Sequence, residues 1–248
     1  MEYHGETFIT VNAQPAALNI EPARTAVIVV DMQNDFGSKG GMFDLANIDI
    51  SMIQAAIPPT ATVLASARGR GLRTIYLKMG FRPDLTELGA ADSANRTRHT
   101  RMGVGKNVAA PNGAEGRILI RDTWNTDIVP ELQPHASDAV IYKHRFSGFY
   151  QTELHAHLQQ AGIKYLVFTG CTTSICVEST VRDAMFRDYI CVLLSDCMGE
   201  PIGNDLPRSN HEASLLTMQI LFGWVSDSAE FVKALSHQEV ARRVTGSS

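Results

Sequence analysis

The chain has 248 residues, with 22 Lys and Arg against 26 Asp and Glu and a formal net charge of −4. This balance lacks the basic surplus on which nucleic-acid binding by counterion release depends, and no apolar run of about 18 residues could span a membrane. No Pro/Gly/Ser-rich linker divides the sequence. We therefore expect a single domain over 1–248, with its core over about 22–235.

The two termini and the number of cysteines indicate the expected cellular compartment. The N-terminal stretch has no basic region followed by an apolar one, so no secretory signal is expected. Four cysteines are too few for a disulfide scaffold, and a reducing cytoplasm is the expected compartment. The final stretch, 236–248, is expected to be a flexible tail.

Five short apolar runs predict buried strands, at 25–32, 73–79, 138–143, 164–170 and 189–196. The first, fourth and fifth are apolar on successive residues and rich in β-branched side chains. That pattern is typical of parallel strands covered by helices on both faces.

Amphipathic segments alternate with these runs and predict helices at 58–71, 150–162, 177–188 and 210–222. Pro58 is acceptable in a first helical turn, and Gly71 suits a helix end. Alternating strands and helices predict an α/β fold, a three-layer α/β/α sandwich around a mainly parallel sheet.

The segment 81–125 interrupts this alternation. It is polar and rich in glycine, and it has little periodicity. A loop of this length in a compact domain usually serves as a lid, a binding loop or an oligomer contact.

Three residues with reactive side chains follow or end predicted strands. Asp31 closes the first strand, Lys143 ends the run at 138–143, and Cys176 follows the run at 164–170. Active sites of such sheets lie at the carboxyl ends of the strands. Taken singly, each residue has a simpler explanation: Asp31 could form a turn, Lys143 could be exposed to solvent, and Cys176 could be an unreactive residue of the core. Their joint placement favours a site.

These groups could support acyl transfer through a thioester. A nearby ammonium or a helix N-terminus lowers the pKa of a thiol and so promotes attack by sulfur. Asp31 could take the thiol proton and pass it on, while Lys143 would hold both charges in place. No dinucleotide or phosphate-loop motif is present, and no cofactor is expected.

The motifs DMQNDF at Asp31, YKHRFSGF at Lys143 and GCTTSICVEST at Cys176 resemble those of the isochorismatase-like cysteine hydrolases, with matching segments over about 22–235. Within that family, SGFYQTEL, LVFTG, CVEST and FGWVSD are most similar to the ureidoacrylate amidohydrolases. GFRPDLTEL and GRILIR are similar instead to the biuret hydrolases.

The resemblance implies a catalytic triad of Asp31 as base, Lys143 as electrostatic partner and Cys176 as nucleophile. It implies a cis peptide bond between Cys171 and Thr172, and an oxyanion hole formed by the backbone N–H groups of Thr172 and Cys176. The segment MGFRPDL lacks the Asp/His metal set of the nicotinamidase branch, so no metal is expected. Family members commonly form dimers or tetramers, which implies a homo-oligomer.

Further residues are candidates for binding the substrate, although each aromatic could equally belong to the core. They are Gln33, Phe36, Met79, Phe81, Arg82, Trp124, Phe149 and Tyr150. The ureidoacrylate enzymes have polar and aromatic residues where this chain has Met79 and Phe81, which puts recognition of that substrate's ureido end in doubt.

The expected function is therefore that of a metal-independent cysteine amidohydrolase, which cleaves a C–N bond of a small ureido or carbamoyl compound through a thioester. The partner would be that small molecule, with no nucleic acid and no membrane. Two alternatives stay open: a vinyl-ether or ester hydrolase on the same scaffold, and a binding module without catalysis.

Overall fold

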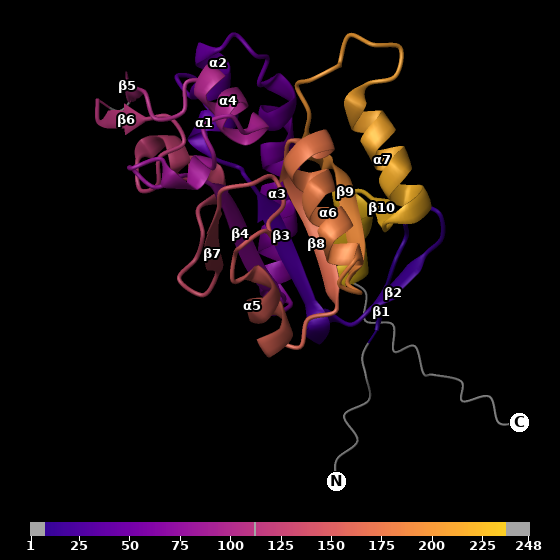
Figure 1. Cartoon of the computed structure of the whole chain (residues 1–248). Coiled ribbons are helices and arrows are strands. Elements are labelled where there is room, and N and C mark those ends of the chain that lie inside the picture. Colours follow the sequence, from indigo (N-terminus) through magenta and orange to yellow (C-terminus); the bar gives the residue numbers. More distant parts are fainter. Residues whose placement is uncertain (1–7, 112, 237–248) are drawn as a thin grey trace, which may run out of the picture.

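A parallel β-sheet forms the centre of the computed structural model, which describes residues 8–111 and 113–236 (Figure 1). The six described strands of this sheet lie in the order β10-β9-β8-β3-β4-β7, and every neighbouring pair is parallel. Their bounds in chain order are β3 Thr25–Val30, β4 Arg73–Met79, β7 Ala139–Lys143, β8 Tyr165–Cys171, β9 Ile190–Gly199 and β10 Trp224–Ser226. The five predicted strands are confirmed, and β10 is additional.

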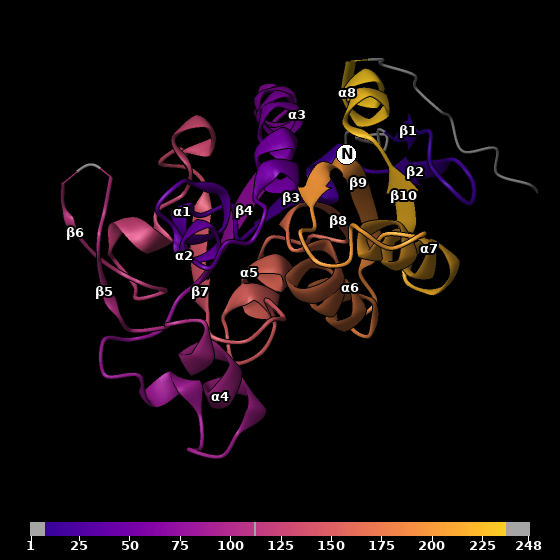
Figure 2. The same cartoon turned by 90° about the horizontal axis from the view of Figure 1, so that it is seen from above.

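Helices cover both faces of the sheet (Figure 2). One face carries α3 Ser51–Gly69 and α8 Ser228–Ser236, and the other carries α5 Leu154–Gln160, α6 Glu178–Met185 and α7 Asn210–Leu221. The predicted α/β/α sandwich is therefore confirmed. A small antiparallel pair, β1 Ile9–Val11 with β2 Leu18–Ile20, lies beside α8.

The central strand β3 shows why continuous apolar runs suit this position. All six of its residues are buried. Val27 and Val29 pack into the apolar core on the α3 side, whereas Ala26, Ile28 and Val30 pack into the core on the α6 side. Side chains alternate between the faces of a strand, so a strand covered twice needs an apolar residue at every position.

Short elements surround the carboxyl ends of the strands. The helices are α1 Asn34–Gly37 and α2 Met42–Leu45. The 3-10 helices are η1 Pro22–Arg24, η2 Thr86–Leu88, η3 Trp124–Thr126 and η4 Pro130–Leu132. A π-helical turn, η5 Thr173–Val177, leads directly from β8 into α6.

The expected start of the helix at 58–71 is wrong. Helix α3 begins at Ser51 and contains Pro58 in its interior. The preceding residues Ile53, Ala56 and Ile57 already bury one helical face, and this packing outweighs the loss of proline's hydrogen bond. Gly71 follows the helix with φ +73°, as a helix end requires.

The segment 81–125 is more ordered than its composition suggests. It contains α4 Ala94–Arg101 and the hairpin formed by β5 Asn107–Ala109 and β6 Glu115–Arg117. Ser93 caps α4, since its hydroxyl accepts a hydrogen bond from the Arg96 N–H at 3.2 Å. A serine before this helix is the sequence signal that could have revealed it.

No described helix is long and apolar enough to cross a membrane. Of the tail predicted at 236–248, Ser236 ends α8 and residues 237–248 lie outside the described part.

Gly170 of β8 lies directly against Val30 of β3, just before the turn that contains Cys176. A Cβ atom at this residue would lie 2.0 Å from the Val30 carbonyl oxygen, and the φ angle is +117°.

We predict that Gly170→Ala lowers the free energy of unfolding by about 4 kcal/mol, because overpacking against backbone adds to an unfavourable φ. Denaturant unfolding monitored by circular dichroism measures the change. The matched control is Gly71→Ala, where φ is +73° and nothing lies within 4 Å of the added Cβ. The control should lose only about 1 kcal/mol. Equal losses in the two variants would contradict the steric argument.

Candidate active site

Asp31 and Lys143 form a buried ion pair at the carboxyl edge of the sheet. The Lys143 Nζ lies 2.7 Å from Asp31 Oδ2, and the two side chains are 0% and 1% exposed, lysine first. Asp31 directly follows β3, and Lys143 is the last residue of β7. Because β4 lies between these strands, the lysine side chain reaches past Met79, whose sulfur is 3.7 Å from Nζ.

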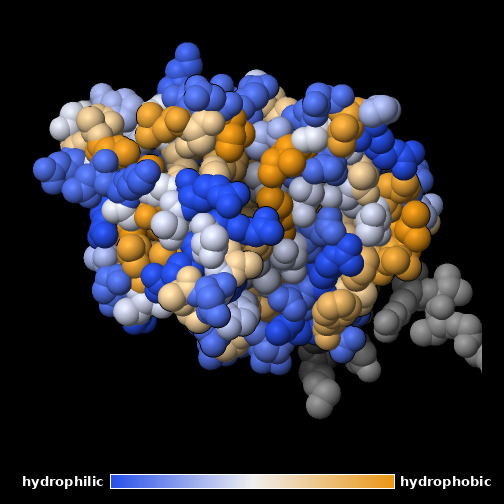
Figure 3. All heavy atoms as spheres, turned by 45° about the horizontal axis from the view of Figure 1, so that its top comes forward, coloured by the Kyte–Doolittle hydropathy of each residue, from blue (hydrophilic) through white to orange (hydrophobic). Residues whose placement is uncertain are grey.

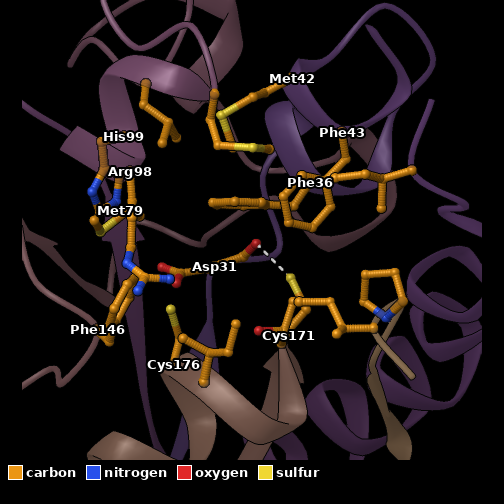
Figure 4. Close-up of a pocket in the computed structure, with 17 residues that line it drawn as sticks. Asp31, Phe36, Met42, Phe43, Met79, Arg98, His99, Phe146, Cys171 and Cys176 are labelled. Atoms are coloured by element: carbon orange, nitrogen blue, oxygen red, sulfur yellow. Dashed lines mark hydrogen bonds between the residues drawn. The ribbon is translucent and has the colours of Figure 1, made fainter. Parts of the chain in front are cut away.

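Cys176 completes this cluster from the π-helical turn η5 after β8. Figure 4 shows its thiol directed at the Asp31 carboxylate. Asp31 and Lys143 are close enough to the thiol to act on its pKa, in opposite directions. The structure therefore brings together the three residues of the predicted triad.

Burial dominates the protonation of the cluster. It raises the pKa of the Cys176 thiol to about 12, and the neighbouring Asp31 adds to this effect, although Lys143 opposes it. Burial also raises the pKa of Asp31. Burial alone would lower the pKa of Lys143, but the charges of Asp31 and Cys176 outweigh it, so that pKa is raised.

The resting thiol is therefore protonated, next to an ammonium group and a carboxylate. The sequence argument that Lys143 would lower the thiol pKa identified a real interaction, yet desolvation is the larger effect. A neutral thiol becomes a nucleophile only if a neighbouring base takes its proton. Asp31 is positioned for that transfer.

The turn that carries Cys176 begins at a cis peptide bond between Cys171 and Thr172, as the resemblance implies. The Cys171 thiol donates a hydrogen bond to the Asp31 carbonyl at 3.2 Å. All four cysteines lie in the described part of the chain, and all are free.

Two residues of the DMQNDF motif brace the site rather than line it. The side-chain amide of Gln33 makes two hydrogen bonds with Met79: its oxygen accepts from the Met79 N–H at 2.6 Å, and its nitrogen donates to the Met79 carbonyl at 2.9 Å. Asp35 accepts hydrogen bonds from the Met42 N–H, the Leu119 N–H and the Asn125 amide. These contacts connect the loop after β3 to β4 and to the 81–125 segment.

Sequence reasoning missed Glu200, which is fully buried. Its carboxylate accepts hydrogen bonds from the Ser174 N–H at 2.7 Å and the Ile202 N–H at 3.0 Å. It thus joins the Cys176 turn to the loop after β9. The signal was a polar residue following a strand, but the predicted strand ended at 196 whereas β9 continues to Gly199.

A cavity of about 220 Å³ opens beside the cluster, and Asp31, Thr172 and Cys176 line it. Most of the other lining residues are apolar: Phe36, Met42, Phe43, Ile48, Met79, Met102, Leu119, Phe146, Cys171, Ile175, Pro201 and Ile202. The two remaining ones are Arg98 and His99 of α4. Ligand pockets commonly combine apolar walls with a few polar groups in this way.

The predicted substrate-binding residues divide into two groups. Phe36 and Met79 line the cavity, as do Thr172 and Cys176 of the predicted oxyanion hole. The others are not among its described lining residues: Gln33, Phe81, Arg82, Trp124, Phe149 and Tyr150.

Packing explains these positions. Phe81 is fully buried and packs edge-on against the His99 ring, whereas Phe149 stacks on Tyr189. Arg82 is 62% exposed and pairs with Glu87, away from the cavity.

The 81–125 segment supplies Arg98, His99, Met102 and Leu119 to the cavity, none of which was singled out from the sequence. The Asn95 carbonyl accepts a hydrogen bond from His99 Nδ1, 2.7 Å away. Burial lowers the pKa of His99, so it is neutral near pH 7. In the described residues, no three His, Cys, Asp or Glu side chains group as metal ligands would.

The fold and the site together are of the isochorismatase-like hydrolase type, and comparison with known proteins agrees. The isochorismatase domain matches residues 25–230. The chain therefore belongs to the isochorismatase family, and the prediction of a hydrolase from this family is confirmed.

Individual relatives cover most of the chain. It is 37% identical to the ureidoacrylate amidohydrolase RutB of Serratia proteamaculans, over 93% of this chain and 90% of that protein. It is 38% identical to the RutB of Methylorubrum extorquens, over 95% of this chain and 92% of that protein.

Solved structures show the same fold. A cysteine hydrolase from Pseudomonas syringae pv. phaseolicola superposes with a TM-score of 0.74 and 27% identity, covering 88% of this chain and 94% of that one. An N-carbamoylsarcosine amidase from Thermoplasma acidophilum gives a TM-score of 0.60 and 24% identity, covering 83% and 96%.

We predict that Lys143→Met destabilises the protein by about 3 kcal/mol at pH 8, because a carboxylate is left buried without its cation. Removing the ammonium raises the Asp31 pKa further above 3.8. The folded state then holds the proton more tightly than the unfolded state, so stability is present at low pH and is lost as pH rises. Unfolding free energies measured from pH 5 to pH 8 should therefore decrease.

The control is the double variant Asp31→Asn/Lys143→Met, which carries no charge at the pair. It should lack this additional pH dependence and be more stable than Lys143→Met at pH 8. If the single and double variants share one pH profile, the buried pair is not the cause.

Proposed function

We propose that the protein is a metal-independent cysteine amidohydrolase, which cleaves a C–N bond of a small ureido or carbamoyl compound through a thioester on Cys176. One observation carries the proposal: a protonated thiol, a buried carboxylate and its ammonium partner meet beside a small cavity. The ureidoacrylate relatives supply the substrate class.

In the first half-reaction, Asp31 accepts the thiol proton as the sulfur bonds to the ureido carbonyl carbon. The π electrons of that carbonyl move to its oxygen. Backbone N–H groups of Thr172 and Cys176 are the proposed donors to this oxyanion, since both residues line the cavity. When the tetrahedral intermediate collapses, the C–N bond breaks and the leaving nitrogen takes the proton from Asp31.

In the second half-reaction, water attacks the carbamoyl thioester. Asp31 accepts a proton from this water, and the second tetrahedral intermediate breaks its C–S bond. Carbamate leaves, and the sulfur recovers its proton from Asp31. Lys143 keeps the carboxylate ionised between these transfers by its charge, 2.7 Å away.

Cys176→Ala should reduce kcat/KM for ureido substrates by about 10⁴-fold or more, since it removes the nucleophile. Asp31→Asn should cost about a thousandfold, because an amide cannot accept the thiol proton. Release of ammonia from ureidoacrylate, biuret and N-carbamoyl amino acids provides the assay. Circular dichroism verifies that both variants remain folded.

The matched control is Cys197→Ala, which changes a fully buried cysteine outside the cavity. It should keep most of the activity. Substantial turnover by Cys176→Ala would rule out the thioester. Hydrolysis of isochorismate or esters in preference to every ureido compound would favour a different hydrolase, and no turnover of either would favour a binding module.

Activity should survive exhaustive chelation, because the proposed steps draw the nucleophile, the base and the oxyanion donors from the protein itself. The measurement is ammonia release after dialysis against EDTA, with the metal content determined by mass spectrometry. A loss of activity that is restored by adding one divalent metal would contradict this prediction.

A further inference from the structure

Arg98 is a charged residue on the wall of an otherwise largely apolar cavity. It lies on α4, and Figure 4 shows its side chain extending from that helix toward Asp31 and Cys176. Lys143 is already paired with Asp31, and the pKa of His99 is lowered. Among the described residues that line the cavity, Arg98 is therefore the single cation without a carboxylate of its own.

The guanidinium of Arg98 makes no hydrogen bond or ion pair with any described residue. The neighbouring arginine of the same helix behaves differently. Arg96 donates to the Gly89 carbonyl at 2.8 Å and to the Leu85 carbonyl at 3.4 Å, and so holds the loop before α4. Arg98 has no such structural task, and its donors are available to a ligand.

Arg98 also lines a second hollow outside the cavity, which we call the outer groove. Phe146 lines both as well, so the two hollows have these two side chains in common. Apolar and hydrophilic residues are interspersed over this face of the molecule (Figure 3).

The other two arginines of the outer groove are engaged. Arg145 donates to the Glu87 and His144 carbonyls, each at 2.7 Å, and Arg182 pairs with Glu178 at 2.7 Å. Of the three arginines that line the outer groove, only Arg98, which also lines the cavity, has no partner among the described residues.

The planar guanidinium matches a carboxylate with two parallel hydrogen bonds. Asp31, on the same cavity, repels an anionic group. An acid would therefore bind with its carboxylate at Arg98 and its neutral ureido end at Cys176. The apolar walls between, including Phe36, Met102 and Phe146, suit an apolar body.

We propose that the substrate is a ureido acid with an apolar body and that Arg98 is the specificity-determining residue that binds its carboxylate. This inference rests on the proposed function and narrows the substrate class. It assigns a role to α4, within a segment that the sequence marked only as irregular.

The test compares acids with the neutral ureas that lack only the carboxyl group. The pairs are 3-ureidopropionate with ethylurea, and N-carbamoyl-leucine with 3-methylbutylurea. The wild-type protein should prefer the acid in each pair, and N-carbamoyl-leucine should be the better of the two acids. Kinetics of ammonia release give kcat and KM for every combination of protein and substrate.

Arg98→Gln should lower kcat/KM for the acids by about 30-fold to 100-fold, mainly through KM, since a charge-assisted hydrogen bond is lost. The neutral ureas should change by less than about threefold, because they never contact the guanidinium. Arg98→Lys should recover part of the loss, as its charge remains without the paired geometry. Arg101→Gln, an exposed arginine of α4 outside both hollows, is the control and should leave all rates unchanged.

An equal effect of Arg98→Gln on acids and ureas would overturn the assignment, as would wild-type preference for the neutral ureas. In both cases hydrolysis itself still stands, and with it the proposed function. If the wild-type protein hydrolyses none of these acids and ureas, and neither ureidoacrylate nor biuret, the proposed function fails together with the substrate class.

Discussion

The buried ion pair between Asp31 and Lys143 is the constraint on which the site depends. With both side chains almost fully inaccessible, neither charge could be kept without the other, because an unpaired ion at such a position costs several kcal/mol. The pair fixes the ends of β3 and β7 across the intervening strand β4. Burial raises the pKa of the Asp31 carboxyl beside Cys176, and the charge of Lys143 opposes that effect.

The rest of the site is arranged to hold this pair and the thiol in place. Gln33, in the loop after β3, makes two hydrogen bonds with Met79 at the end of β4 and so connects that loop to the neighbouring strand. Glu200 does the same for the Cys176 turn and the loop after β9. Both side chains are satisfied by backbone groups, which is why they cost little despite their burial. Rigid support of this kind lets a neutral thiol and its base meet without rearrangement.

The 81–125 segment has a different character. It is attached through Asp35, whose carboxylate is buried and carries a pKa raised to about 6, mainly by desolvation. Its helix α4 covers the cavity with Arg98 and His99, and Met102 follows directly after that helix. The sheet edge thus contributes Asp31 and Cys176 to the cavity, and the segment contributes part of its walls. A scaffold shared with relatives can in this way accept different substrates.

The sequence by itself determined the layered fold and indicated the three residues that meet at the edge of the sheet, Asp31, Lys143 and Cys176. Continuous apolar runs are readable because a strand buried on both faces tolerates few polar residues, and parallel topology sends the ends of β3, β7 and β8 to one edge. The predicted strands and the motifs around Asp31, Lys143 and Cys176 carried that information locally.

Only the tertiary structure decided which other side chains line the cavity. Phe81 and Phe149 pack in the interior, Arg82 turns to Glu87, and Arg98 enters the cavity from a helix that composition did not reveal. It also decided that burial, rather than the lysine, dominates the protonation of Cys176. Both outcomes depend on long-range packing and desolvation, which local residue patterns do not encode.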